Sequence, residues 1–362
     1  MSSAPTDPEV AVPTPDVEGA PAGYTLTLRG SEARVALSPG KTLLDACLSQ
    51  QVVMPYNCRS GECGECAVRL VKGKVHEMPG ADPAIFTRAM RESGLVLACM
   101  AFPRSDVELD VPAGLALQPR ILSFDAVIQR VAWFGERTAH VTVRRPEGVQ
   151  FTGGQYFEWH IPGIERPRLY SAANAPGGPL MEFLVRIYPG GVVSAKLRRG
   201  EIDAGDVLPM RGPFGSYSFR ADDPGTAIFV AGGTGLAPVR SIVMDALSGQ
   251  GPDRQIIVFM GARDQAELAA AQELEQAALR HRKLKFVPVL SHEPADSGWG
   301  GRRGLVTDVL GSMLGDQFGA QAYLCGPAPM VEAALPILDV CGLARSDIHC
   351  DKFVPAESAR PQ

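Results

Sequence analysis

The chain has 362 residues, a length that predicts two or three domains. Apolar residues make up 45% and charged residues 21%, values typical of globular proteins with buried cores. The formal net charge of −5 argues against general nucleic-acid binding, because phosphate affinity requires a positive field. The longest uncharged run, 224–239, is too short and too rich in Gly and Pro to span a bilayer, and no signal peptide is visible. We therefore expect a cytoplasmic protein that binds neither membrane nor nucleic acid.

The first third of the chain divides into a leader, a compact unit and a linker. Residues 1–22 hold five prolines and few apolar groups, which predicts a disordered leader. The segment 23–112 combines a strand hairpin around Gly30, a short amphipathic helix, a cysteine-rich loop and a return through 96–102. The uncharged stretch 113–119 is typical of a linker.

The rest of the chain changes character at about residue 222. Residues 120–222 contain short strand patterns separated by Gly and Pro, which predict an antiparallel barrel. In 223–362, apolar strand patterns alternate with helical ones, among them one long helix over 265–282. This alternation predicts a parallel α/β sheet with helices on both faces. The expected fold class is therefore multidomain, with α+β and α/β parts.

Four of the eight cysteines have the spacing of an iron–sulfur site. Cys58, Cys63 and Cys66 follow the pattern C-x4-C-x2-C, and Cys99 comes after 32 further residues, which is the plant-type pattern for a 2Fe-2S cluster. Two glycines in the loop let the backbone wrap closely and point N–H groups at the sulfurs. A zinc site is the alternative, although zinc prefers two CxxC pairs and the loop has one.

This segment resembles the plant-type ferredoxin family, including the sequences PYNC and LVLAC around the first and last cysteine of the pattern. The resemblance implies a β-grasp domain over 23–112 that holds a 2Fe-2S cluster. Arg59 and Glu65, next to the ligands, are either solvated charges or contacts to a partner. Three other cysteines are expected only to pack in the interior: Cys47, Cys341 and Cys350.

Two motifs in the barrel segment make chemical sense together, although each alone is weak. The first is Arg168-Leu169-Tyr170-Ser171, in which the guanidinium of Arg168 can bind a phosphate and the face of Tyr170 can lie against a ring system. The second is a Gly-Gly turn before a helical segment, whose first N–H groups favour a pyrophosphate. It comprises Gly190, Gly191, Val192, Val193 and Ser194.

With these motifs the chain resembles the ferredoxin–NADP reductase-like superfamily, whose barrel binds FAD through R-x-Y-S and G-G-x-x-S. The resemblance implies that Arg168 contacts the FAD phosphates, that Tyr170 flanks the isoalloxazine ring, and that Ser171 acts catalytically near its N5 atom. It also implies that the backbone from Val185 to Ile187 edges the flavin. FMN is the alternative cofactor.

A third motif is a Gly-rich turn between a strand and a helix. Such a turn suits a phosphate, but it lacks the GxGxxG fingerprint. The same superfamily has GGTG-x-AP at this place and C-G-P after a later strand. The resemblance implies that Thr234 lines the nicotinamide site and that Cys325 is a catalytic group near the hydride-bearing carbon; a small buried core residue is the plain alternative for Cys325. The two segments contain Gly232, Gly233, Thr234, Gly235, Cys325, Gly326 and Pro327.

The C-terminal segment and the nucleotide preference complete the expected site. Relatives place an acid and an aromatic residue beside the flavin, which by resemblance assigns Asp351 and Phe353, the latter as a lid over the isoalloxazine ring. The charges after the second strand of the last domain, Arg263 and Asp264, are mixed and slightly favour NADH over NADPH.

The three sites together predict an electron-transfer enzyme. A hydride carries two electrons, a 2Fe-2S cluster accepts one, and FAD can handle both. No oxygen-activating motif is visible, so the electrons should leave for a partner. The order ferredoxin–FAD–NAD resembles reductase components of multicomponent oxygenases, which implies a terminal oxygenase, by preference an aromatic-ring Rieske dioxygenase. The alternatives are a diiron monooxygenase, a deoxysugar dehydratase, or a zinc-loop binding module without redox activity.

Overall fold

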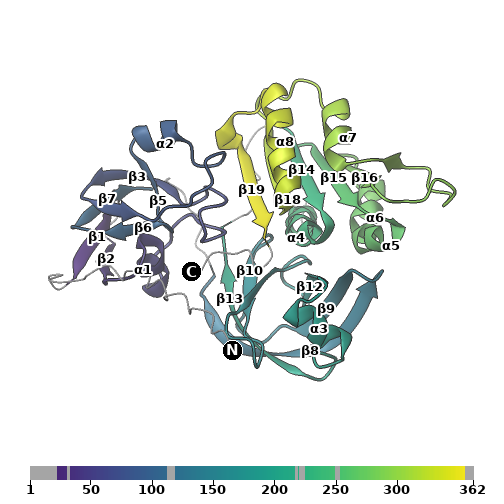
Figure 1. Ribbon diagram of the computed structural model, residues 1–362, viewed down its shortest axis with the longest axis horizontal. Coiled ribbons are helices and arrows are strands. Elements are labelled where there is room, and N and C mark those ends of the chain that lie inside the picture. Colours follow the sequence, from purple (N-terminus) through teal and green to yellow (C-terminus); the bar gives the residue numbers. More distant parts are fainter. Residues whose placement is uncertain are drawn as a thin grey trace, which may run out of the picture.

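The computed structural model describes residues 23–30, 33–111, 119–216, 219, 225–248 and 253–354. The expected leader, 1–22, and all but the last residue of the expected linker, 113–119, lie outside this part of the chain. The described residues form three lobes, each built on its own sheet (Figure 1). Within them, every helix is too short or too polar to cross a lipid bilayer.

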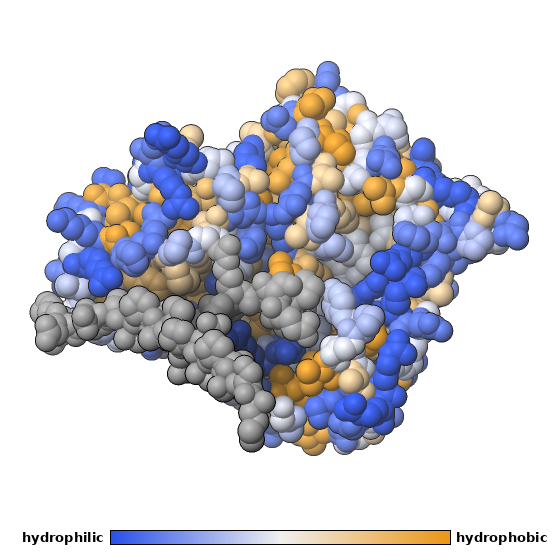
Figure 2. All heavy atoms as spheres, in the orientation of Figure 1, coloured by the Kyte–Doolittle hydropathy of each residue, from blue (hydrophilic) through white to orange (hydrophobic). Residues whose placement is uncertain are grey.

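The N-terminal lobe is a five-stranded sheet with two short helices. Helix α1 (Leu43–Ser49) buries four of its seven residues against the sheet. Helix α2 (Arg88–Glu92) buries none and gives a hydrophilic surface (Figure 2). The expected hairpin around Gly30 is confirmed, since the first two strands are antiparallel. The sheet order is β2 (Arg34–Leu37), β1 (Tyr24–Leu28), β7 (Val107–Asp110), β3 (Ala67–Lys72) and β5 (Leu95–Leu97), with a separate pair β4 (Val75–Glu77) and β6 (Ala101–Pro103).

The return segment 96–102 is not one continuous strand. It breaks between β5 and β6 into a turn, which is closed by a 2.9 Å hydrogen bond from Met100 N to Leu97 O. The Ala98 N–H donates to the carbonyl of Cys66 at 3.0 Å. Contacts with the cysteine loop therefore shape this turn, and they place Cys99 beside that loop.

The middle lobe is a nearly closed antiparallel barrel. A bridge between Ala172 and Phe183 links its two end strands. Helix α3 (Val192–Arg198) packs Val193 and Leu197 against the barrel core. The strand order is β11 (Arg168–Ser171), β10 (Tyr156–Trp159), β13 (Val207–Phe214), β8 (Leu122–Phe134), β9 (Thr138–Arg144) and β12 (Leu180–Arg186).

The C-terminal lobe is a parallel sheet covered on both faces, as expected. Helices α4 (Leu236–Leu247) and α6 (Gln272–Arg280) contribute to the core on one face, and α7 (Val306–Met313) and α8 (Ala328–Val340) to the core on the other. The strand order is β17 (Arg302–Arg303), β16 (Leu284–Leu290), β15 (Ile256–Ala262), β14 (Ala227–Gly232), β18 (Gln321–Pro327) and β19 (Ile348–Phe353).

The expectation of one long helix over 265–282 is wrong. The segment begins with α5 (Gln265–Leu268), passes through a 3-10 turn, η2 (Ala269–Ala271), and continues as α6. At the turn, the carbonyl of Ala270 accepts a 3.5 Å hydrogen bond from the buried side chain of Arg240. A side chain that takes up a backbone carbonyl in this way interrupts a helical ladder, and sequence periodicity does not reveal it.

Candidate functional site

The cysteine loop, 58–66, depends on glycine at two positions. Gly61 and Gly64 both have φ of +80°, a conformation that residues with a Cβ rarely adopt. A Cβ on Gly61 would lie 3.2 Å from the Cα of Ala81, and one on Gly64 would lie 3.0 Å from Cγ2 of Ile85. The loop therefore needs glycine at these two positions to wrap tightly against its neighbours.

The four thiols form two pairs. Cys66 Sγ lies 3.2 Å from Cys99 Sγ, too far for a disulfide, and the thiols of Cys58 and Cys63 are hydrogen-bonded to each other. A 2Fe-2S cluster takes two protein ligands on each iron, so this donor set fits such a cluster. Among the residues described, no three His, Cys, Asp or Glu side chains gather around a single metal-ion position.

Backbone N–H groups surround the first thiol pair. The N–H groups of Ser60 and Glu62 point at Cys58 Sγ at 3.4 and 3.3 Å, and that of Glu65 points at Cys63 Sγ at 3.5 Å. The hydrogen bond with Cys63 is the largest cause that lowers the pKa of Cys58 to about 6, against the effect of burial. The same hydrogen bond raises the pKa of Cys63. Because metal ligation requires the thiolate at both positions, the backbone N–H groups are the donors that favour the ligating form of the pair.

The cysteine loop contacts the barrel through its charged and backbone groups. Arg59 donates to Glu158 on β10 at 3.0 Å and also pairs with Asp45 at 3.4 Å. The hydroxyl of Tyr156 donates to the carbonyl of Asn57 at 2.9 Å. Arg59 is thus a contact between domains of one chain, a use that sequence alone left open.

The same loop contacts strand β19 on its other side. Glu65 pairs with His349 at 2.8 Å, which answers the question of its partner. Asp351 lies against Asn57 and is partly buried there; burial, and then the negative charge of Cys58, raise the pKa of Asp351 to about 7. The expected acid of the C-terminal segment therefore faces the ferredoxin lobe.

The RxYS motif forms strand β11. Tyr170 packs on Trp159 with ring centroids 4.4 Å apart, and burial raises the pKa of its hydroxyl. Arg168 donates to the carbonyl of Arg166 at 2.7 Å, while Leu169 is exposed. Ser171 is buried at the end of the strand, where it could meet a ring held against the barrel.

The Gly-Gly motif forms the start of helix α3, with Gly191 as the N-cap. No side chain caps this end, so its first N–H groups are available to an anion. The Ser194 hydroxyl accepts a 2.9 Å hydrogen bond from Tyr188 N–H and so holds the turn. Val192 is exposed and Val193 is buried. This helix start fits the phosphates of a flavin nucleotide.

Strand β12 of the barrel lies against the Gly-rich turn of the C-terminal lobe. The side chains of Val185 and Ile187 lie in the barrel core, which leaves only their backbone for a flavin. Arg186 pairs with Glu267 at 2.7 Å, and its Nη1 atom would lie 4.0 Å from a Cβ on Gly233. Sequence reasoning missed this ion pair, because its members lie 81 residues apart and belong to no motif.

The Gly-rich turn and the C-G-P segment lie together. Ala231 is opposite Cys325 in the register of β14 and β18. A Cβ on Gly235 would lie 2.0 Å from the carbonyl oxygen of Cys325, and one on Gly232 would lie 2.5 Å from Sδ of Met330. The glycines in and beside the 3-10 turn η1 (Gly233–Gly235) thus allow the turn to pack closely against the C-G-P segment and the start of α8. They also leave the backbone open to a phosphate. Thr234 is buried.

Strand β19 places the C-terminal segment beside strand β18 and its C-G-P segment. Its register with β18 places Asp351 opposite Cys325 and Phe353 opposite Pro327. Phe353 is partly buried at the carboxyl end of the sheet, where ligands of open α/β sheets bind.

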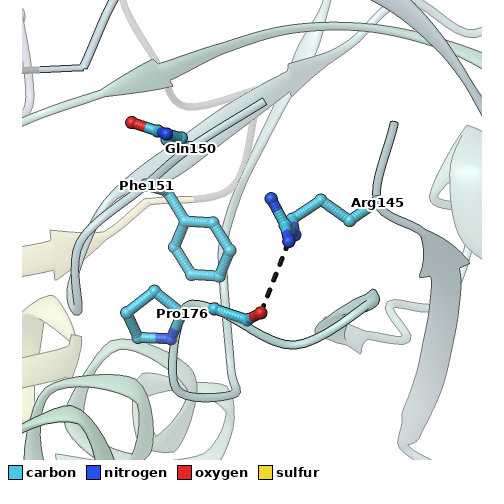
Figure 3. A pocket seen from close by; sticks show the side chains of 5 residues that line it. Arg145, Gln150, Phe151 and Pro176 are labelled. Atoms are coloured by element: carbon cyan, nitrogen blue, oxygen red, sulfur yellow. Dashed lines mark hydrogen bonds between the residues drawn. The ribbon is translucent and has the colours of Figure 1, made fainter. Parts of the chain in front are cut away.

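One cavity lies away from these motifs (Figure 3). It has a volume of about 380 Å³ and is lined by Arg145, Gln150, Phe151, Pro176 and Gly177. The guanidinium of Arg145 donates to three backbone carbonyls, including that of Gly177 at 3.4 Å. Its hydrogen bonds hold the loops around the cavity, and none of the expected cofactor residues lines it.

Three family matches cover most of the chain. Residues 26–104 match the 2Fe-2S iron-sulfur cluster binding domain, 135–219 the oxidoreductase FAD-binding domain, and 229–335 the oxidoreductase NAD-binding domain. Together with the thiol pairs, they define an NAD(P)H-dependent flavin iron–sulfur oxidoreductase of the ferredoxin-reductase type. The alternatives of a zinc site and of a redox-inactive binding module are therefore wrong.

Individual relatives show which reductases of this class the chain is similar to. The chain is 34% identical over 340 residues to the phenol 2-monooxygenase reductase component DmpP of Pseudomonas sp. (strain CF600), covering 92% of this chain and 95% of that one. It is also 34% identical to the ferredoxin–NAD(P)(+) reductase component of the naphthalene 1,2-dioxygenase/salicylate 5-hydroxylase systems of Ralstonia sp, covering 88% and 94%. The crystal structure of Amycolatopsis cytochrome P450 reductase GcoB superposes with a TM-score of 0.75 at 33% identity, covering 92% and 99%.

The chain belongs to the family of oxygenase reductase components that join a 2Fe-2S ferredoxin domain to FAD- and NAD-binding domains. It transfers electrons from NAD(P)H through FAD to the 2Fe-2S cluster. When bound, the flavin accepts a hydride and releases single electrons. The protein itself supplies the contacts between the ferredoxin, FAD-binding and NAD-binding domains, such as the ion pairs of Arg59, Glu65 and Arg186.

Proposed function

We propose that this reductase supplies electrons to an oxygenase component that acts on aromatic compounds. The substrates in the names of two relatives carry the proposal, since phenol, naphthalene and salicylate are all aromatic. The acceptor we favour is an aromatic-ring Rieske dioxygenase, supported by the naphthalene 1,2-dioxygenase relative. A diiron monooxygenase is the second candidate, supported by the phenol 2-monooxygenase relative, which has the same 34% identity over more residues.

The roles of individual residues are part of the same proposal. Cluster ligation falls to Cys58, Cys63, Cys66 and Cys99, supported by the two thiol pairs. Arg168 and the start of α3 bind the FAD phosphates, and Tyr170 and Ser171 lie at its ring. Thr234 and Cys325 line the nicotinamide site, with Phe353 as the lid over the flavin.

The extent of each domain also belongs to the proposal. We place the ferredoxin domain at 23–112, the FAD-binding barrel at 120–222 and the NAD(P)-binding domain at 223–362, and the sheets of the three lobes fall within these limits. A cytoplasmic location follows from the need to keep the ligand cysteines reduced.

For the nucleotide, we propose NADH. Asp264 follows β15, where a carboxylate suits a free ribose diol; in this structure the same carboxylate caps α5 and pairs with Arg137 at 2.5 Å. Arg303, a possible partner of a 2′-phosphate, donates instead to carbonyls of its own loop, at 2.6 Å to Glu293 and 3.0 Å to Pro294. The ratio kcat/KM for NADH over NADPH in ferricyanide reduction tests this preference, and a ratio below one would contradict it.

Reconstitution tests the acceptor. The purified reductase would be combined with a Rieske dioxygenase component or with a diiron monooxygenase component, each with its aromatic substrate, under NADH. We expect product formation coupled to NADH oxidation with the dioxygenase. Coupled turnover with the monooxygenase alone would favour the second candidate, and NADH oxidation without product in both mixtures would exclude both.

A further inference from the structure

A buried lysine on strand β19 bridges two domains. Strand β19 is the edge strand of the parallel sheet nearest the ferredoxin lobe (Figure 1). Its residue Lys352 has a side chain only 1% exposed, and the ammonium group pairs with Asp82 of the ferredoxin lobe and, at 3.0 Å, with Glu332 of helix α8. One partner therefore lies in the other domain, and the second lies in its own.

Asp82 is tied directly to the cysteine loop. Its N–H donates to the carbonyl of Gly61 at 3.2 Å, in the centre of that loop. Its carbonyl accepts from Phe86 N–H at 2.8 Å, and its Oδ1 atom accepts from Ala84 N–H at 2.9 Å. The residue before it, Ala81, packs on Gly61. Because Asp82 is hydrogen-bonded directly to the cysteine loop, a shift of Asp82 would also shift the loop.

The charges of the lysine and its partners reinforce the contact. The Asp82 side chain is 13% exposed, whereas that of Glu332 is 56% exposed. Removing one member of a buried ion pair leaves a charge without compensation, and this is far more costly than the loss of a surface pair. The bond between the domains is therefore the stronger one, and the bond within the C-terminal lobe is the weaker.

We propose that Lys352 is a positioning residue that holds the cysteine loop in place for electron transfer from flavin to cluster by binding Asp82. In this step one electron leaves the reduced flavin and one enters the oxidised cluster, with NAD(P)H as the reductant. The protein supplies distance and orientation for such a transfer. The proposal rests on the electron path of the family and is independent of which oxygenase accepts the electrons.

Matched variants separate the bond between domains from the bond within one domain. Asp82→Asn removes the interdomain partner but keeps the Oδ1 acceptor for Ala84. Lys352→Met removes the charge from the other domain, and Lys352→Arg restores it. Glu332→Gln is the control, because it removes only the partner within the C-terminal lobe. All four are made in the full chain with FAD and cluster bound.

Each variant is measured for its rate of electron transfer, for the contact between the lobes and for the state of its cluster. Stopped-flow absorbance after mixing with NADH gives the rate of cluster reduction, with NADH-dependent ferricyanide reduction as the check on the flavin. Amide hydrogen exchange of β19 and of residues 80–86, in protein that has received no NADH, reports whether the two lobes stay in contact. Cluster content and the EPR spectrum of the dithionite-reduced protein show whether the cluster itself is intact.

We expect Asp82→Asn and Lys352→Met to slow cluster reduction about tenfold, the factor that follows if the docked population falls to about one tenth. Amide exchange at the contact should rise, while cluster content, EPR spectrum and ferricyanide reduction stay normal. Lys352→Arg should recover most of the rate, and Glu332→Gln should match the parent protein. Equal slowing by Glu332→Gln, normal rates in both charge-removing variants, or loss of the cluster in both would overturn the proposal.

Discussion

The cysteine loop and the Gly-rich turn before α4 are both tight, glycine-containing segments, but they are built differently. The loop 58–66 contains three of the four thiols and its own N–H donors, so its chemistry is local in sequence. The turn Gly233–Gly235 is completed by Cys325, which comes from another strand 90 residues later. A self-contained site can be interpreted from spacing, whereas a site made of two segments needs the fold.

The largest expected effect concerns the self-contained site. Cys63→Ser should abolish cytochrome c reduction, because the cluster loses a ligand, yet spare NADH-dependent ferricyanide reduction through FAD. Parallel assays with both acceptors check this, with Cys47→Ser as a control at a buried cysteine outside the loop. Equal loss of both activities in Cys63→Ser would argue against a linear path from flavin to cluster.

The site made of two segments should be sensitive to a single methyl group. A Cβ at Gly235 would lie 2.0 Å from the Cys325 carbonyl oxygen, although φ at this residue is an ordinary −59°. Gly235→Ala should therefore lower the free energy of unfolding by about 3 kcal/mol through overpacking. Urea denaturation measures this against Gly315→Ala, where a Cβ meets open space. Equal stability of the two variants would show that the segments can separate without cost.

A charge cluster between the barrel and the C-terminal lobe gives a pH dependence. The hydrogen bond with His140 (3.0 Å), assisted by the charge of Arg240 (2.5 Å) and opposed by burial, lowers the pKa of Glu182 to about 2. An unfolded glutamate titrates at about 4.3. Because the folded pKa is the lower one, the stabilisation is complete above about pH 5 and is lost as the pH falls through 4 towards 2.

The size of this effect is moderate because Glu182 is 27% exposed. The pKa difference corresponds to about 3 kcal/mol, which solvent screening reduces to about 2 kcal/mol. Glu182→Gln should flatten the decline of unfolding free energy between pH 5 and pH 3, measured by urea denaturation at each pH. The exposed Glu147→Gln serves as control. A parallel decline in both variants would mean that Glu182 carries no such linkage.

The smallest effect tests the flavin end of the path. Ser171→Ala should slow flavin reduction by NADH about tenfold, the loss expected for one hydrogen bond in the transition state. FAD content should stay the same, because the phosphates are held elsewhere. Anaerobic stopped-flow absorbance measures the rate, and an unchanged rate would count against a role of Ser171 near the ring.

Sequence predicted most of the architecture because the strongest patterns are local. The C-x4-C-x2-C spacing, the barrel strands and the strand–helix alternation each lie within short windows, and the family matches agree with them. The break at Ala269–Ala271 was missed because the contact found there, from Arg240 of α4 to the Ala270 carbonyl, joins segments 30 residues apart. Local periodicity cannot contain that information.

The contacts between domains were beyond sequence for the same reason. Arg59 and Glu65 were ambiguous until Glu158 and His349 appeared as their partners, 99 and 284 residues away. Lys352 carried no motif, and its only hint was its position beside the expected aromatic lid. Charged residues that belong to no motif acquire a role only when the fold shows what faces them.

Rapid mixing with NADH under anaerobic conditions tests the central claim that one chain passes electrons from NAD(P)H through FAD to its cluster. Flavin absorbance is followed by stopped flow, and the reduced cluster is followed by EPR of samples frozen at matched times. The account predicts that flavin reduction comes first and that the cluster signal follows it. A cluster signal that precedes flavin reduction, or that forms at the same rate after FAD is removed, would contradict it.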